Sequence, residues 1–211
     1  MKSIFKIALL ITSLYLVLGF AIKSPADTVK LYPVADSYVH YSNPDTNFGN
    51  MDFLYCMYSY NPHGPAPQAW ILVRFDISSI PEGSVANEAY LYLYVYEEYF
   101  PYTYTCRLSV SDWDEYKVTW NNRPQRGGAE TRCAGNIGWI RWDVSVNVNS
   151  WLKGEIPYGF IITPDYWTDH YIKGWSREYT DSSLRPYLEI DYTPPTSIYP
   201  SSLGDIKAIY H

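Results

Sequence analysis

The feature that most restricts the fold is a strict two-residue alternation between residues 88 and 97. Aliphatic side chains occupy every second position, and tyrosines occupy the positions between them. Successive side chains of an extended strand point to opposite faces, so this segment has one aliphatic and one aromatic face. The aliphatic residues are Ala89, Leu91, Leu93 and Val95, and the tyrosines are Tyr90, Tyr92, Tyr94 and Tyr96. The segment is predicted to be a β-strand whose aliphatic face belongs to the core.

Shorter extended segments follow one another along the chain, separated by turns rich in Pro and Gly. No stretch has a convincing helical period, which excludes a fold of alternating strands and helices. The other expected strands are 28–32, 37–41, 53–60, 70–77, 102–110, 139–148, 158–163 and 188–192. Short strands joined by turn-rich loops predict an all-β fold, a sandwich or jelly roll, in one domain spanning residues 28–193.

The first 21 residues have the pattern of a secretory signal peptide. Lys2 and Lys6 precede an apolar run over residues 7–20, and Gly19 and Ala21 are small residues before a cleavage point. The run is shorter than the roughly 20 residues that span a bilayer, which favours cleavage over a retained membrane anchor. We expect export, no membrane span in the mature form, and an extracellular or cell-surface location. Residues 194–211 are rich in Pro and Ser and predict a tail or linker.

The charge of the chain argues against a nucleic-acid partner. Removing residues 1–21 takes away two of the 16 basic residues and none of the 22 acidic ones, so the net charge moves from −6 to −8. A chain this acidic repels phosphate backbones, and the sequence has no basic stripe. Its 23 Tyr and 8 Trp residues favour another kind of contact, because such rings combine an apolar body with a polar tip.

The chain has three cysteines, Cys56, Cys106 and Cys133. If two of them form a disulfide, the third remains a free thiol, and the sequence does not decide among the three possible pairings. We favour Cys106–Cys133, because the stretch between them reads as a long excursion that a bridge would restrain. Closing a loop of that size contributes roughly 3.5 kcal/mol in the chain-entropy model. No CxxC motif is present, so neither a zinc site nor a redox site is predicted.

Catalytic motifs are not found. A glycosidase needs two carboxylates held at a set distance across a cleft, and the acidic residues at 97–98 and 112–115 read as solvated loops. The four histidines are scattered and no GxSxG motif is present, although a triad assembled in space stays open. We therefore expect a protein that is not an enzyme and has no catalytic cofactor.

Sugar binding is the chemistry that the aromatic residues suit best, since sugar sites combine apolar platforms with a few polar groups. One candidate site is the tyrosine ladder formed by Tyr90, Tyr92, Tyr94 and Tyr96. The other is the loop around residues 165–171, with Tyr166, Trp167 and Asp169. The alternative for the ladder is burial against a second layer or edge of the sandwich, and the loop likewise has a purely structural alternative.

A structural calcium ion is a further expectation. Asp36, Asn43, Asp45 and Asn47 place several oxygen atoms within one short stretch, and calcium prefers oxygen ligands. We take Asp36, Asp45 and Asn47 as its candidate ligands. The spacing is not that of an EF-hand loop, and an ordinary turn rich in Asx residues is the competing interpretation.

Several short patterns, taken in order from residue 35 to residue 192, resemble one family, the DNRLRE domain, which is grouped with carbohydrate-binding modules of family ninety-six. They are Ala35-Asp36-Ser37-Tyr38-Val39, Asn47-Phe48-Gly49, Leu72-Val73-Arg74-Phe75-Asp76, Val118-Thr119-Trp120-Asn121-Asn122-Arg123-Pro124, Ser176-Arg177-Glu178 and Arg185-Pro186-Tyr187-Leu188. The resemblance implies a jelly-roll β-sandwich of an extracellular or cell-surface protein. Trp175 departs from the family pattern, in which a smaller aromatic residue is usual at this position.

Two functions follow from these observations. The first is a secreted, non-catalytic carbohydrate-binding module that recognises extracellular polysaccharide or a cell-surface glycan. The second is a structural or adhesive surface protein that assembles through contacts between sandwiches, with the tyrosine ladder and the C-terminal tail as protein contacts. Glycan binding and oligomeric state would separate the two.

Overall fold

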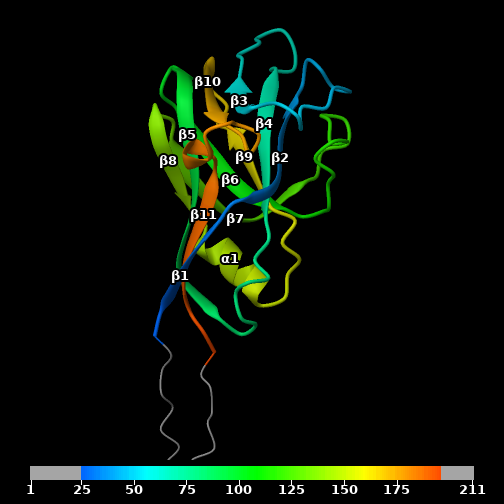
Figure 1. The fold of residues 1–211 in the computed structure, drawn as a ribbon. Helices are drawn as coiled ribbons and strands as arrows, with labels where there is room; N and C mark the ends of the chain where they lie inside the picture. The colour runs from blue at the N-terminus through cyan, green and yellow to red at the C-terminus, as the bar shows by residue number, and fades with distance from the viewer. Residues whose placement is uncertain (1–24, 196–211) are drawn as a thin grey trace, which may run out of the picture. The chain divides into compact units, whose positions relative to one another are not determined.

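The computed structural model describes residues 25–195, and the account that follows concerns this part of the chain (Figure 1). It contains eleven β-strands, one α-helix and one short 3-10 helix. The strands are β1 (Asp27–Leu31), β2 (Pro33–His40), β3 (Phe53–Tyr58), β4 (Gln68–Phe75), β5 (Val85–Tyr99), β6 (Thr103–Ser109), β7 (Arg126–Ala134), β8 (Gly138–Asp143), β9 (Phe160–Pro164), β10 (His170–Trp175) and β11 (Tyr187–Thr193). The helices are α1 (Ser145–Leu152) and η1 (Ser182–Leu184).

The strands form one curled antiparallel sheet. Its order is β1-β11-β5-β10-β3-β4-β9-β6-β7, with β2 paired to β4 and β8 paired to β5. The long strand β5 pairs with both β11 and β10 along one edge, and with β8 along the other. The prediction of an all-β fold is confirmed, and the jelly-roll connectivity stays a prediction.

The two halves of the curled sheet share one hydrophobic core. The aliphatic face of β5 is buried, with Leu91 fully buried and Leu93 at 2% exposure, as the alternation predicts. It belongs to the same apolar cluster as Ile71 of β4 and Ile162 of β9 from the other half. A sheet that curls until its inner faces meet buries aliphatic side chains from both halves together.

A second, smaller cluster lies on the outer face of β4 and β9. Trp70 and Ile161 contribute to it from the strands, and Trp113 and Trp120 cover them from the segment between β6 and β7. This segment buries apolar residues that would otherwise face water, and it continues directly into the start of β7.

The helix α1 was not expected from the sequence. Its residues are mostly β-branched or Asn and Ser, which are weak helix formers. Tertiary contacts stabilise it instead: the side chains of Asn147 and Asn149 each exchange two hydrogen bonds with the backbone of Ala129 and Ala86 respectively. The expected strand 139–148 therefore ends at Asp143, and its last residues belong to the helix.

The strands β7 and β10 were also missed. The sequence of β7 includes two glycines and three charged residues, and it was read as an excursion. It nevertheless pairs with β6 from Thr103 opposite Ala134 to Ser109 opposite Arg126. A strand at the edge of a sheet tolerates polar residues because one of its edges and one of its faces lie in solvent.

The predicted disulfide between Cys106 and Cys133 is wrong, since all three cysteines are free thiols. The register explains the result, because Cys106 lies opposite Thr131 and Cys133 lies opposite Tyr104. The two cysteines are thus offset along the paired strands. The segment between the two cysteines, which the disulfide was expected to restrain, is held instead by the pairing of β6 with β7.

Within the part of the chain that the structure describes, no helix has both the length and the apolar character needed to cross a membrane. The predicted signal peptide over residues 1–21 lies outside the described residues, as does the predicted tail from residue 196 onward.

Candidate functional site

A polar groove with a volume of about 370 Å³ lies on the outer face of β6, β7 and β9. Side chains from these three strands and from the loop after β9 form its walls. The lining residues are Thr105, Arg107, Arg126, Glu130, Arg132, Thr163, Pro164, Asp165 and Tyr166. A hollow lined by several charged side chains and one aromatic ring can bind a polar ligand of low molecular weight or one segment of a polymer.

The alternation of the strands places these side chains on one face. On β6, Tyr104 and Cys106 are fully buried in the core, so the intervening Thr105 points outward. Arg132 of β7 lies opposite Thr105 in the ladder and shares its face. The antiparallel pairing of three strands thus gathers residues that are distant in the chain, such as Thr105 and Asp165, which are 60 positions apart and joined by a hydrogen bond.

The acidic residues of the groove are paired with arginines. Glu130 accepts a hydrogen bond from Nε of Arg132 at 2.7 Å and forms a second ion pair with Arg107. Arg132 also lies 3.6 Å from Asp165. The hydrogen bonds from Arg132 and Arg107 hold the pKa of Glu130 below its ordinary value. Glu130 is therefore ionised at neutral pH and does not meet the requirement for a general acid.

Two neighbouring arginines have no acidic partner: Arg126 lines the groove, and Arg123 lies over the same ring, that of Trp70. Among the residues that the structure describes, no ion pair involves Arg123 or Arg126. Arg126 donates to the hydroxyl of Thr163 at 2.9 Å and lies over Trp70, with its Cζ atom 4.5 Å from the ring centroid. Arg123 lies over Trp120 at 3.9 Å. Rings that stack on guanidinium groups fix their planes but leave their charge uncompensated.

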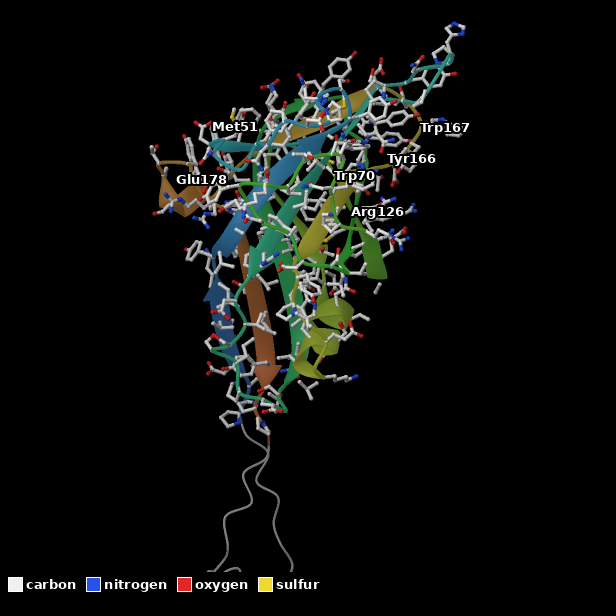
Figure 2. The ribbon with its side chains drawn as sticks, turned by 90° about the vertical axis from the view of Figure 1, so that its right-hand side faces the viewer. Met51, Trp70, Arg126, Tyr166, Trp167 and Glu178 are labelled. Carbon is white, nitrogen blue, oxygen red and sulfur yellow. The ribbon has the colours of Figure 1, made fainter. Side chains whose placement is uncertain are left out.

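Exposed aromatic rings flank these arginines. Trp167 is 79% exposed and Tyr166 is 49% exposed. Figure 2 shows both rings projecting on the side of the molecule that carries Arg126 and Trp70. Asp169, predicted to bind a ligand, accepts a hydrogen bond from the backbone N–H of Tyr60 at 2.6 Å. Of this candidate set, Tyr166 lines the groove, Trp167 projects beside it, and Asp169 joins the loop to the β3–β4 connection.

The tyrosine ladder lies elsewhere, on β5 in the other half of the sheet. Its rings are half-buried, and two of them have a ring face covered by another aromatic side chain. Tyr92 stacks on Tyr187 with 4.4 Å between ring centroids, and Tyr96 stacks on Trp175 with 3.9 Å. The structure therefore does not bring the two predicted aromatic sites together. Sugar binding at the ladder stays a prediction.

The predicted calcium ligands have other partners. The side chain of Asn47 donates to the carbonyl oxygens of Glu115 and Val118 and accepts from the N–H of Gly49. Asp45 accepts a hydrogen bond from Asn121. These bonds join the 41–50 turn to the segment between β6 and β7. Only the bond from Gly49 to Asn47 is local, as in an Asx turn, and calcium binding by Asp36, Asp45 and Asn47 stays a prediction.

Asp36 belongs to a buried carboxylate cluster that the sequence reading did not identify. Carboxylate oxygens of Asp36, Glu115 and Glu178 lie within 4.8 Å of one another. Arg177 holds the cluster together, with Nε 2.9 Å from Glu178 and its backbone N–H donating to Asp36. Burial, followed by the charge of Glu178, raises the pKa of Asp36 well above its ordinary value. Three oxygen-bearing side chains could hold a hard cation, but Arg177 already supplies a positive charge at this place.

The arginines of the groove were missed by the sequence reading. Arg107, Arg126 and Arg132 lie far from any basic run, and β7 was not expected as a strand. Only the alternation within residues 102–110 could have indicated that Arg107 points away from the core. The register between β6, β7 and β9 was needed to bring the cations together.

Comparison with known families gives one match over most of the chain. The model of carbohydrate-binding module family 96 matches residues 27–192. These residues include all of the described strands but the last residue of β11.

The chain is also similar to a short part of several bacterial proteins. It is 32% identical over 108 residues to the tRNA nuclease WapA of Bacillus subtilis (strain 168). The tRNA3(Ser)-specific nuclease WapA of Bacillus spizizenii has the same identity over the same length. In both cases the match covers 48% of this chain and 4% of the relative, so the chain spans only a small fraction of these proteins.

Proposed function

Since the chain belongs to carbohydrate-binding module family 96, we propose that it is a secreted, non-catalytic module and that the arginine-lined groove is its binding site. We further propose that the ligand is an acidic polysaccharide, one whose sugar units carry carboxylate or sulfate groups. The nuclease activity named for the WapA relatives is not carried over, because the match covers 4% of their length.

The observation that carries the proposal is the pair of arginines without acidic partners beside exposed rings. A neutral glycan would leave the charges of Arg123 and Arg126 uncompensated, whereas an acidic sugar would pair with a planar guanidinium through two hydrogen bonds. Tyr166 and Trp167 lie next to these charges, and aromatic rings can stack on the apolar faces of sugar rings.

The ionised groups of the groove also favour a linear, charged chain over a small neutral sugar. Arg107, Glu130 and Arg132 already form an ion-pair network, so an incoming anion would have to exchange partners there. Arg123 and Arg126 need no such exchange. We therefore place the first contact with an acidic group at Arg126.

Calorimetry with a matched pair of oligosaccharides tests the proposal. One is a polyuronate oligomer, and the other is the same oligomer with its carboxyl groups reduced to alcohols. We expect binding of the first only, and a loss of affinity of about tenfold to a hundredfold in Arg126→Gln, because a charge-assisted hydrogen bond contributes roughly 1.5–3 kcal/mol. A Trp167→Ala variant should also bind more weakly if the ring stacks on the ligand.

Arg141→Gln is the matched control. Arg141 lies on β8 in the other half of the sheet, where it donates to Tyr92. Its removal lowers the positive charge of the chain by the same amount and should leave the affinity unchanged. Equal binding of the acidic and the reduced oligomer, or equal losses in both variants, would contradict the proposal.

Self-association is a second candidate function, favoured by the aromatic surface around β5. Trp139 is 41% exposed and Tyr32 is 51% exposed at the rim of the stacked tyrosines, and a large exposed aromatic face is typical of a contact surface. Light scattering of the mature chain over a range of concentrations tests this. A monomer at every concentration, unchanged by Trp139→Ser, would count against it.

Secretion rests on residues 1–21 alone. Expression of the full chain in a host with a secretory pathway, followed by N-terminal sequencing of the protein in the medium, tests it. A mature chain that begins at residue 22 is the expected result.

A further inference from the structure

His170 is a buried histidine directly behind the loop that carries Tyr166 and Trp167. It is the first residue of β10, and only 1% of it is exposed. Its ring lies among three tyrosines, with Tyr102 at 4.6 Å, Tyr104 at 5.4 Å and Tyr58 at 6.0 Å between ring centroids. Residues 165–169 form the loop, so a change in the state of His170 acts on the segment that presents the two exposed rings.

Hydrogen bonding defines the form of the imidazole. Nδ1 lies 2.7 Å from the carbonyl oxygen of Thr168. A carbonyl can only accept, so Nδ1 carries the proton and Nε2 is the unprotonated nitrogen of the neutral ring. Nε2 is buried, and no described residue gives it a hydrogen bond. Proton uptake at Nε2 would therefore create a buried N–H group and a buried charge at a place without an acceptor.

The charged groups near His170 come from the loop itself. Asp165 and Asp169 favour the protonated form, but both carboxylates have other partners: Thr105 and Arg132 for Asp165, and the N–H of Tyr60 for Asp169. The facing groups from β3, from β6 and from the residue just before β6 are the rings of Tyr58, Tyr104 and Tyr102, respectively. Burial outweighs the two aspartates and the bond to Thr168, so the pKa of His170 is lowered from 6.5.

We propose that His170 makes the groove sensitive to acid: its protonation loosens residues 165–169 and weakens ligand binding at Tyr166 and Trp167. The inference rests on the proposed function and adds a regulation to the same site. Because the native state favours the neutral ring, the contribution of His170 to stability is complete above pH 6.5. It declines as the pH falls from 6.5 toward the lower pKa of the native state.

The first experiment needs no ligand. Imidazole nitrogen NMR of the full chain between pH 7.5 and 5 reports the tautomer of His170 and its pKa, and hydrogen exchange reports the protection of the amide of Tyr60. We expect an Nδ1-protonated ring at pH 7.5, and a drop in the protection factor of Tyr60 when His170 takes up a proton. The opposite tautomer, or unchanged protection of Tyr60 once NMR shows that His170 has taken up a proton, would overturn the inference.

The second experiment measures binding of the polyuronate oligomer over the same pH range, in which its carboxylates stay ionised. Wild-type affinity should fall as His170 takes up a proton, by up to about tenfold for each unit by which the bound ligand lowers the pKa of His170 relative to the free protein. In His170→Asn, whose amide can still donate to Thr168 but cannot take up a proton, the affinity should not change with pH. His40→Asn is the control, since His40 stacks on Tyr55 away from the groove and its removal should leave the pH dependence intact.

The two proposals can fail separately. Loosening of the loop without binding at any pH would contradict the proposed function and leave the acid sensitivity of the loop standing. Binding that is equally strong with the His170 ring neutral and protonated in the wild type would overturn the inference and leave the proposed function standing. Should His170→Asn fail to fold, the titration of the wild-type ring and the exchange of Tyr60 decide the matter.

Discussion

At the scale of single residues, Arg177 forms ion pairs with two members of the carboxylate cluster. It lies between two carboxylates, 2.9 Å from Glu178 and 3.6 Å from Glu115, and Asp36 is only 1% exposed next to them. The three acidic residues come from β2, from the segment between β6 and β7, and from the segment after β10. One cation thus joins three parts of the chain that are distant in sequence, at the side of the molecule opposite Trp167 in Figure 2.

Replacing Arg177 with Met is expected to lower the free energy of unfolding by about 3 kcal/mol, because breaking its partly buried ion pairs leaves the buried carboxylates of Asp36 and Glu115 without a compensating charge. The loss should be smaller at pH 5 than at pH 8. The raised pKa of Asp36 means that the native state holds a proton more readily than the unfolded state, so protonation relieves the repulsion and stability falls as the pH rises. Urea denaturation at the two pH values measures this.

Arg185→Met serves as the comparison for this variant. Arg185 donates to the carbonyl of Tyr179 and has no ion pair among the residues described. Its loss should cost about 1 kcal/mol at either pH, the contribution of one hydrogen bond. A loss at Arg177 that is the same at both pH values would contradict the electrostatic account.

At the scale of elements, α1 shows how side chains can replace strand pairing. Asn147 accepts from the N–H of Ala129 at 2.8 Å and donates to its carbonyl at 3.0 Å, which is the pattern that a neighbouring strand would supply. Asn149 does the same for Ala86. The helix therefore covers the ends of β5 and β7 without adding to the sheet, and Figure 1 shows it beside those strands.

Asn147→Ala should lower the free energy of unfolding by about 2–3 kcal/mol, since it removes two hydrogen bonds and leaves the partly buried backbone groups of Ala129 unpaired. Thermal or chemical denaturation checks the value. Val146→Ala is the control on the same helix, because Val146 is 71% exposed and Ala has the higher helix propensity. A cost at Val146 equal to that at Asn147 would mean that helix formation, and not the paired amide, is being measured.

At the scale of the whole molecule, the position of the charges matters more than their sum. The chain has a net charge of −6, yet the outer face of β6, β7 and β9 gathers arginines in one groove. The overall charge repels a polyanion at long range, and this repulsion is screened beyond about 8 Å at physiological ionic strength. The local cations then decide whether the ligand binds.

The affinity for a polyuronate oligomer is expected to fall several-fold between about 0.1 and 0.5 M NaCl, because salt weakens the exposed charge pairs. The affinity of the Arg126→Gln variant should fall less steeply with salt, since one of the charge pairs between protein and ligand is missing. An affinity that does not change with salt would show that stacking on the aromatic rings, and not charge, carries the binding.

The sequence alone predicted the all-β class, most of the strands, and the buried face of β5, because a two-residue alternation allows only one way of burying Leu91 and Leu93. The family resemblance that it indicated is confirmed by the match over residues 27–192. It also indicated Tyr166 and Trp167 as candidate binding residues, and the structure shows that both rings are exposed.

Only the tertiary structure placed Arg107, Arg126 and Arg132 in one groove and Asp36, Glu115 and Glu178 in one cluster. Such sites depend on which strands are neighbours and on their register, and neither is written in the local pattern of a single strand. The same reason explains the missed strand β7 and the wrong disulfide: a polar edge strand carries a weak signal by itself, and its partner β6 determines where Cys133 lies.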